Sequence, residues 1–409
     1  IGSFVVTSEL AKGRVKSSSE GAEGDVRASE EGRLKTLFRL TALSAALFGL
    51  SESAWAHPII NSTAPANTTG IVATGNASET AVGGGSARGV GSVAVGAFAK
   101  AGTRIEADGA VAIGGSQANT GAYADGNNAI AIGQASNAYA AKAISIGSDT
   151  IASDQFATAL GGRAEAKERG ATAIGGWSQA TGQFAVAIGG SDRFGRDTNT
   201  ELNDGSGATL ASGARSTAIG RRAKASGNDT LAFGTNAEAT GVEAVAIGKG
   251  AASTAAKALA LGQGARAQAG NTVAFGTGAQ ATQDGSIAIG TNTIATGVYK
   301  DTSRKGKAIA IGYNTNALGE SSIAIGADDS AYGALTASSR QGIAIGTGAK
   351  ATGETQSIAI GPDAISSGTQ STSIGNNTRA TGDSSIAIGG DDWNIVREKT
   401  VAAAGNKQV

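Results

Sequence analysis

The chain has 409 residues with 33 basic and 33 acidic side chains, and a formal net charge of zero does not favour nucleic acid or an anionic membrane as a partner. It has no cysteine, which excludes disulfides and thiolate metal sites as a source of stability. Glycine is frequent at 64 residues and aromatic residues make up only 4%, a composition that favours tight turns and thin, closely packed layers.

Residues 1–56 have the features of an extended secretory signal region. A basic stretch at 33–39 precedes the apolar run 40–50, and the Ala-Trp-Ala sequence at 54–56 has the A-x-A form of a cleavage site. A membrane anchor is the alternative, but the eleven residues of the apolar run are fewer than the roughly 18 to 20 that span a bilayer. We therefore expect cleavage near residue 56 and a mature protein that begins at His57.

Residues 57–86 are rich in Asn, Thr, Ala, Gly and Ser and have no sustained apolar period. This composition predicts a flexible or weakly ordered lead-in. Three Asn-x-Ser/Thr triplets begin at Asn61, Asn67 and Asn76. They fit glycosylation in a eukaryotic secretory pathway, but we favour chance occurrence in a segment so rich in these residues.

Between residues 93 and 389 a short apolar strand ends on glycine nineteen times, in the pattern Φ-x-Φ-Gly. Twelve of the eighteen spacings between successive motif glycines are fourteen residues. A fixed period is typical of a solenoid, in which each unit contacts chiefly its sequence neighbours. We expect these glycines to occupy positive-φ turn positions that a Cβ atom would strain, among them Gly234, Gly248, Gly262, Gly276, Gly290, Gly326, Gly375 and Gly389.

Each fourteen-residue unit has room for two short strands and two turns. In one such strand, Ile287 and Ile289 point to one face and Ala288 points to the other. Stacking the units as parallel strands about 4.8 Å apart predicts an all-β fold, a parallel β-roll on the order of 90 Å long. We expect isoleucine and valine to fill the interior of each roll, and much of the alanine face to lie between chains.

Residues that carry catalysis or bind cofactors are few. The only histidine is His57, which excludes His-based triads and His-rich metal sites. The periodic glycines form no Gly-x-x-x-x-Gly-Lys-Ser/Thr loop for a phosphate. Calcium-binding β-rolls repeat about every nine residues, and Asp328 and Asp329 belong to no repeated ligand pattern. We therefore expect no enzymatic activity, no cofactor and no metal.

Six spacings depart from fourteen, and such insertions map to loops on one face of a solenoid, where binding is favoured. The spacing of 31 after Gly189 includes the candidate ligand residues Arg193, Phe194 and Arg196. The spacing of 22 after Gly290 includes Tyr299, Lys300, Arg304, Lys305 and Lys307. Basic residues beside an aromatic ring suit an acidic glycan or a matrix protein. The alternative is a solvated loop that covers an edge of the roll.

The run Ser-Ile-Ala-Ile-Gly at 286–290, together with Ala-x-Ala-x-Gly stretches such as 349–353, resembles the YadA-like head of the trimeric autotransporter adhesins. The resemblance covers roughly residues 93–389. The stretch Phe-Val-Val-Thr-Ser-Glu-Leu-Ala-Lys at 4–12 is similar to part of the extended signal region of large autotransported proteins. The resemblance implies a left-handed parallel β-roll and a homotrimer packed around a common axis.

The function that this resemblance implies is attachment. It would make the chain a non-enzymatic virulence-associated adhesin head, displayed at the outer membrane of a Gram-negative bacterium and bound to host cells or extracellular matrix. The chain has no sustained heptad pattern for a stalk and no C-terminal amphipathic strands for a membrane anchor. We therefore expect an N-terminal fragment, with a head at 87–390 and an exit at 391–409 toward a neck or another module. The alternative function is a structural spacer that projects another binding head.

Overall fold

The computed structural model describes residues 80–103, 107–115, 120–191, 207–299, 301–328 and 334–390, together with two short strands at 71–72 and 401–402. The chain divides into two units, Ile1–His57 and Pro58–Val409, and all of the described residues belong to the second. The described part consists of strands and turns, without a helix.

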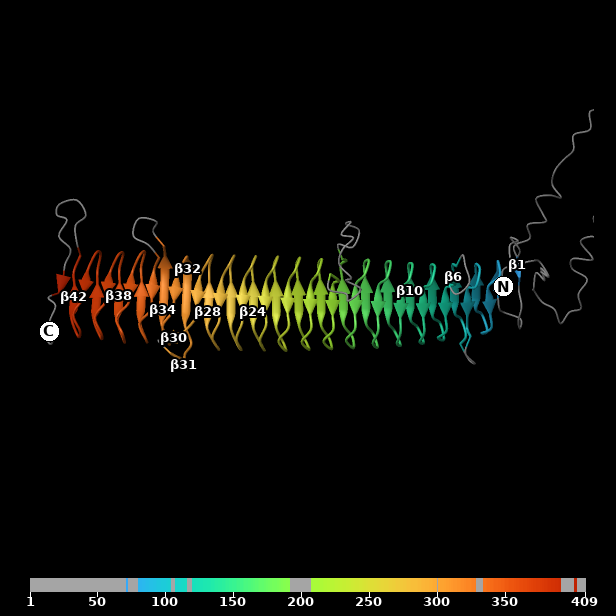
Figure 1. Ribbon diagram of the computed structural model, residues 1–409, viewed down its shortest axis with the longest axis horizontal. Helices are drawn as coiled ribbons and strands as arrows, with labels where there is room; N and C mark the ends of the chain where they lie inside the picture. Colours follow the sequence, from blue (N-terminus) through green and yellow to red (C-terminus); the bar gives the residue numbers. More distant parts are fainter. Residues whose placement is uncertain are drawn as a thin grey trace, which may run out of the picture. The chain divides into compact units, whose positions relative to one another are not determined.

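Each coil of the chain contributes one strand to each of two sheets, which we call the first sheet and the second sheet. In one coil the three-residue strand β20 (Leu231–Phe233) is followed, after a turn, by the two-residue strand β21 (Glu238–Ala239). Both strands pair in parallel with their equivalents fourteen residues later, Leu231 with Val245 and Glu238 with Ala252. The coils therefore lie side by side in sequence order as a β-solenoid, which confirms the predicted parallel β-roll (Figure 1).

The first sheet contains 21 strands in the described part of the chain. Its first strand, β1 (Ile71–Val72), pairs antiparallel with β2, and the remaining strands pair in parallel. These are β2 (Thr80–Val82), β4 (Val93–Val95), β6 (Val111–Ile113), β8 (Ile130–Ile132), β10 (Ile144–Ile146), β12 (Thr158–Leu160), β14 (Thr172–Ile174), β16 (Val186–Ile188), β18 (Thr217–Ile219), β20, β22 (Val245–Ile247), β24 (Leu259–Leu261), β26 (Val273–Phe275), β28 (Ile287–Ile289), β32 (Ile309–Tyr313), β34 (Ile323–Ala327), β36 (Ile343–Ile345), β38 (Ile358–Ile360), β40 (Thr372–Ile374) and β42 (Ile386–Ile388).

The second sheet is built from two-residue strands that pair in parallel throughout the described part. These are β3 (Ser86–Ala87), β5 (Lys100–Ala101), β7 (Tyr123–Ala124), β9 (Asn137–Ala138), β11 (Ile151–Ala152), β13 (Glu165–Ala166), β15 (Gln179–Ala180), β17 (Leu210–Ala211), β19 (Lys224–Ala225), β21, β23 (Ala252–Ser253), β25 (Arg266–Ala267), β27 (Gln280–Ala281), β29 (Ile294–Ala295), β33 (Asn316–Ala317), β35 (Thr336–Ala337), β37 (Lys350–Ala351), β39 (Ile365–Ser366), β41 (Arg379–Ala380) and β43 (Val401–Ala402).

The interior of the solenoid is lined by alanine, serine and threonine. Ala288, at the centre of a first-sheet strand, and Ala295, at the end of a second-sheet strand, are both fully buried. The flanking Ile287 and Ile289 point outward and are only half-buried. The expectation that isoleucine and valine fill the roll, with alanine between chains, is therefore wrong. Only four residues separate β28 from β29, and the inward strand positions of the described coils hold alanine or serine, so the two strands of a coil lie too close together to hold an isoleucine or valine side chain between them.

Hydroxyl groups in this interior donate to turn carbonyl oxygens three residues earlier in the chain. Thr293 Oγ1 donates to the carbonyl oxygen of Gly290 at 3.1 Å, after a first-sheet strand. Thr230 Oγ1 donates to the carbonyl oxygen of Gly227 at 2.8 Å, in the other turn of its coil. A buried polar group costs free energy unless it is hydrogen-bonded, so these bonds let threonine and serine replace alanine in the interior.

All nineteen motif glycines have positive φ values, between 111° and 157°, as predicted. At Gly290, where φ is 124°, a Cβ atom would collide with the carbonyl oxygen of Gly312 in the next coil. Two places after the motif glycine there is a second positive-φ position, which we did not predict. It accepts other residues, because Asn292 and Trp177 adopt ordinary left-handed φ values of 54° and 65° there.

The insertion between Gly290 and Gly312 leaves both sheets continuous. Strand β28 pairs with β32, and β29 pairs with β33, as if the extra residues were absent. Part of the insertion folds back as an antiparallel pair of its own, β30 (Val298–Tyr299) with β31 (Asp301–Lys305). Strand β16 likewise pairs directly with β18 across the longest insertion, although residues 192–206 lie outside the described part. The strands on either side of these two insertions therefore pair directly, and the inserted residues are not needed for that pairing.

The sheets extend beyond the limits that we expected from the repeat. Strand β2 pairs with β4, so the solenoid starts before residue 87, within the 57–86 segment that we expected to be a flexible lead-in. Strand β43, within the 391–409 segment, pairs in register with β41. The expected signal region 1–56 lies outside the described residues. Within the described part, no helix is long and apolar enough to cross a membrane.

Candidate functional site

The outward face of the first sheet is a mostly apolar ladder. From β4 onward, the third position is apolar in every strand of this sheet in the described part, and the first position is apolar except at Thr158, Thr172, Thr217 and Thr372. The residues on either side of each central alanine stack in register from coil to coil, as in the series Val273, Ile287 and Ile309. Several large side chains at the third strand position are 36% to 67% exposed, namely Ile113, Leu160, Phe233, Phe275, Ile325 and Ile388. Soluble monomers rarely expose a contiguous apolar surface of this extent, so the ladder has the character of an interaction surface.

The outward face of the second sheet is polar by comparison, and its charges pair between neighbouring coils. Lys224 Nζ lies 3.3 Å from Glu238 Oε1, one coil further along the same sheet. The turns repeat this arrangement, since Arg163 Nε lies 3.5 Å from Asp149 Oδ2. Exposed pairs of this kind contribute little to stability. In the described part of the chain, no group of three His, Cys, Asp or Glu side chains has the arrangement of a metal site.

A bidentate ion pair joins the turns of two successive coils. Arg215 donates to both carboxylate oxygens of Asp229, with Nε to Oδ1 and Nη2 to Oδ2 distances of 2.6 Å each. The hydrogen bond from Arg215, assisted by its charge, lowers the pKa of Asp229 below its ordinary value. The same contact raises the pKa of Arg215. Bidentate geometry of this kind adds directional specificity to an arginine–carboxylate pair.

Aromatic side chains in the turns pack against cations of neighbouring coils. The guanidinium carbon of Arg163 lies 4.4 Å from the ring centroid of Trp177. Lys142 Nζ lies 5.2 Å from the centroid of Phe156. Both contacts span one coil and fit cation–π attraction, which is modest at exposed sites. They give these rings a structural role between coils.

The structure places only some of the residues predicted in the two insertions. Arg193, Phe194, Arg196 and Lys300 lie outside the described residues. Tyr299 ends β30, and Arg304 and Lys305 end β31. The strand pairing places Lys305 opposite Val298 and Tyr299 opposite Asp301. Lys307 is exposed, and its aliphatic carbons approach Gly285 of the preceding coil, within 3.0 to 3.2 Å of where a Cβ atom of that glycine would lie.

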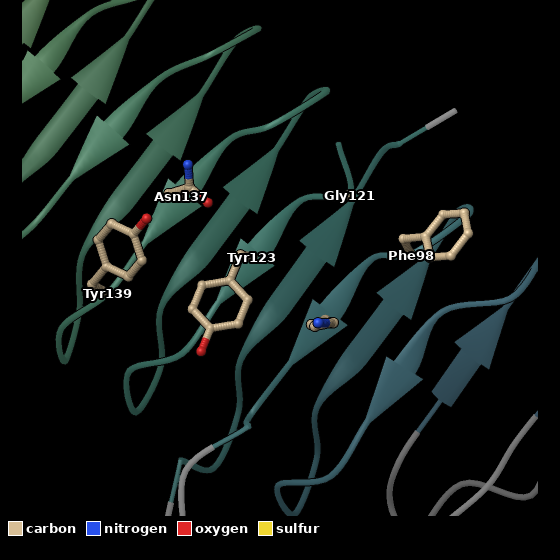
Figure 2. A pocket seen from close by; sticks show the side chains of 6 residues that line it. Phe98, Gly121, Tyr123, Asn137 and Tyr139 are labelled. Atoms are coloured by element: carbon tan, nitrogen blue, oxygen red, sulfur yellow. The ribbon is translucent and has the colours of Figure 1, made fainter. Parts of the chain in front are cut away.

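A pocket of about 400 Å³ lies on the second sheet near its N-terminal end, and we did not predict it. It is lined by Phe98, Lys100, Gly121, Tyr123, Asn137 and Tyr139. Figure 2 shows Tyr123 and Tyr139 side by side, with Phe98 toward the other end. A signal was present in the sequence: these residues lie in and just after the two earliest irregular spacings, of 18 and 19 residues, from Gly96 to Gly133.

The repeat region of the chain matches a known protein family. The family described as YadA head domain repeat (2 copies) matches at several overlapping or successive places along the solenoid. The matched residues are 87–116, 120–136, 124–150, 138–164, 166–191, 211–237, 239–265, 267–293, 306–328, 337–364 and 366–391. A search of curated proteins finds no match for the chain.

Proposed function

The chain belongs to the YadA head family, whose repeats match more than half of its length, and we propose on this basis that it is a non-enzymatic adhesin head. Its task in this proposal is to attach a Gram-negative bacterial cell to host cells or to extracellular matrix. The family membership supports a place on the bacterial surface. The signal features at 1–56, with cleavage near Ala56, would direct the chain there.

The proposed active form is a homotrimer, and the observation that carries it is the exposed apolar ladder of the first sheet. Each coil is already filled by small side chains, so the ladder is not needed to close the interior. A partner that covers it must offer an apolar surface with the same length and the same fourteen-residue spacing. Further copies of this chain meet that requirement because each carries the same ladder with the same spacing. Burial of the ladder at about 25 cal/mol per Å² of apolar area would drive their association.

In this arrangement the polar second sheet and the inserted segments face outward. Three identical faces raise avidity by multivalency without requiring a strong single contact. The strand pair β30–β31, followed by Lys307, is the inserted segment that we propose to contribute to attachment. Both sheets continue across it, so the segment is carried by the solenoid without holding it together.

An attachment assay tests this proposal. Fluorescent beads that carry the chain are applied to cultured host cells and to surfaces coated with matrix proteins. We expect retention of beads above that of uncoated beads, and a loss of at least threefold when the insertion is trimmed to restore a spacing of fourteen between Gly290 and Gly312. The control is Tyr313→Ala in the chain that keeps the insertion. The exposed Tyr313 ring lies outside the inserted residues. If the chain assembles but no surface retains the beads, the spacer alternative replaces the adhesin proposal.

A further inference from the structure

We propose that the pocket on the second sheet binds an acidic saccharide, a pyranose that carries a carboxylate or a sulfate. This rests on the proposed attachment function and gives that function a ligand class. The pocket is a local feature of three successive coils, because Lys100, Tyr123 and Asn137 are register partners at the start of β5, β7 and β9. Its volume of about 400 Å³ falls within the range of small-molecule sites.

The aromatic side chains of this pocket are open to solvent rather than packed away. Phe98 is 47% exposed and Tyr139 is 37% exposed, while Tyr123 is half-buried between their coils. The centroids of the Tyr123 and Tyr139 rings are 5.7 Å apart, and the rings are tilted by 57° (Figure 2). A pyranose presents a face of C–H bonds, which the negative face of an aromatic ring attracts, and hydroxyl groups at its edge. Tilted rings along a shallow pocket offer such faces to a sugar.

Polar groups surround these rings and are held in place. Tyr123 Oη lies 2.9 Å from Thr103 Oγ1, and Thr103 in turn donates to the buried Asp125 carboxylate. Asn137 Nδ2 donates to the carbonyl oxygen of Ala135 at 3.0 Å, which fixes the amide at the pocket wall. Sugar hydroxyl groups need oriented donors and acceptors of this kind.

Burial, with a smaller contribution from Tyr123, raises the pKa of the Tyr139 phenol. An ordinary tyrosine phenol, with a pKa of about 10, is already protonated at neutral pH, and the upward shift acts in the same direction, so the Tyr139 hydroxyl can donate a hydrogen bond there. A neutral phenol also adds no negative charge that would repel an acidic ligand.

The charge of the pocket selects an anion. Lys100 is exposed, and none of the six lining residues is acidic. Its register neighbours on the second sheet are Ser86 and Tyr123. The lysine at the same position of a later coil, Lys224, has Glu238 as its register neighbour and pairs with it. An ammonium group beside sugar-stacking rings favours a carboxylate or sulfate on the ligand and disfavours a cationic one.

The pocket also remains available in the proposed trimer. Its strands belong to the second sheet, whereas the ladder that the trimer covers is on the first sheet. Three copies of the site would then be displayed by one head. Weak individual binding of a saccharide would be sufficient for attachment through multivalency.

The test measures binding of three hexasaccharide probes to the full chain by isothermal titration calorimetry. The probes are a hyaluronan fragment with carboxylates, a heparin fragment with sulfates and a neutral maltohexaose. We expect at least one acidic probe to bind at least tenfold more tightly than the neutral one, and the preferred probe identifies the anionic group. Tyr123→Ala and Tyr139→Ala should each weaken that binding at least tenfold. Lys100→Gln should remove the preference for the acidic probe.

Matched controls separate this site from general surface effects. Tyr313→Ala removes an exposed tyrosine elsewhere, and Lys224→Gln removes the lysine at the equivalent strand position. Both should leave the affinity unchanged, and circular dichroism should show the same fold for every variant. The inference is overturned if no acidic probe binds, or if the pocket variants bind as tightly as the parent chain.

The bead assay distinguishes failure of this inference from failure of the adhesin proposal. If cells or matrix retain the beads but the chain binds no acidic saccharide, the pocket assignment fails and the adhesin proposal stands. If the chain binds an acidic saccharide through the pocket but neither cells nor matrix retain the beads, the adhesin proposal fails and the pocket assignment stands. A fall in bead retention when the chain carries Tyr139→Ala supports both the pocket assignment and the adhesin proposal.

Discussion

At the residue scale, two positions in the turn that follows most first-sheet strands have positive φ but differ in what they accept. The motif glycine, with φ of 124° at Gly290, lies outside the left-handed region that other residues visit, and the next coil fills the place of a Cβ atom. The position two residues later has an ordinary left-handed φ, as at Gly264 with 66°, and no atom lies within 4 Å of the place that a Cβ atom would take there. Asn236 and Asn292 occupy it in other coils. Only the first position requires glycine.

Gly290→Val is therefore expected to disrupt its own coil and the next one. Strain from a disfavoured φ costs about 1 to 3 kcal/mol, and the collision with Gly312 adds to it. In amide hydrogen exchange followed by mass spectrometry, peptides between residues 276 and 318 should exchange at least tenfold faster than in the parent chain. Gly264→Asn and Ile289→Val should leave exchange in their own coils within about threefold. Equal protection in Gly290→Val and Gly264→Asn would contradict this distinction.

At the scale of strands and coils, the interior is formed by small residues and adjacent coils are joined by backbone pairing and charge pairs. The alternation of Ile287, Ala288 and Ile289 predicts two faces of a strand but does not say which one points inward. The distance between the two strands of a coil decides this, and the four-residue turn keeps them close. The period, the paired strands and the glycine conformation were therefore predictable, whereas the burial of alanine was not.

The irregular spacings mark the region of the pocket in the sequence, but the alignment of its lining residues could not be predicted, for a related reason. Lys100, Tyr123 and Asn137 are 23 and 14 residues apart, so they share a column only if the extra residues of the two irregular spacings, which lie between Lys100 and Tyr123, are looped out of register. Which residues pair across an insertion is set by the register of the folded sheets, and the spacing in the sequence does not give that register. The residues predicted at the longest insertion, Arg193, Phe194 and Arg196, stay a prediction because they lie outside the described part.

The Arg215–Asp229 pair between two coils predicts a pH effect. Its hydrogen bond lowers the pKa of Asp229, so the stabilising contribution of the pair is present above the unfolded pKa of about 3.9 and is lost as the pH falls through the lower folded value. NMR titration of the Asp229 carboxyl should give a pKa below the ordinary value. Arg215→Gln should return it toward that value, and Arg266→Gln, on the second sheet, should not. An ordinary pKa for Asp229 in the parent chain would show that the pair does not form in solution.

At the scale of the whole solenoid, the two sheets have different surfaces because their outward residues differ. The first sheet presents half-exposed isoleucine, valine, leucine and phenylalanine, and the second presents mostly polar side chains together with the aromatic pocket. A rod with one apolar face and one polar face is suited to assembly through the first and to binding through the second. The proposed function therefore requires that further copies of the chain cover the apolar ladder.

Sedimentation equilibrium of the chain at micromolar concentration tests this requirement most directly. For the mature chain that begins at His57, we expect a mass three times that of one copy. The double variant Ile311→Glu with Ile345→Glu, on the outward face of the first sheet, should dissociate, and Ile294→Glu, on the second sheet, should remain trimeric. A folded, stable monomer of the parent chain at that concentration would contradict the proposed assembly.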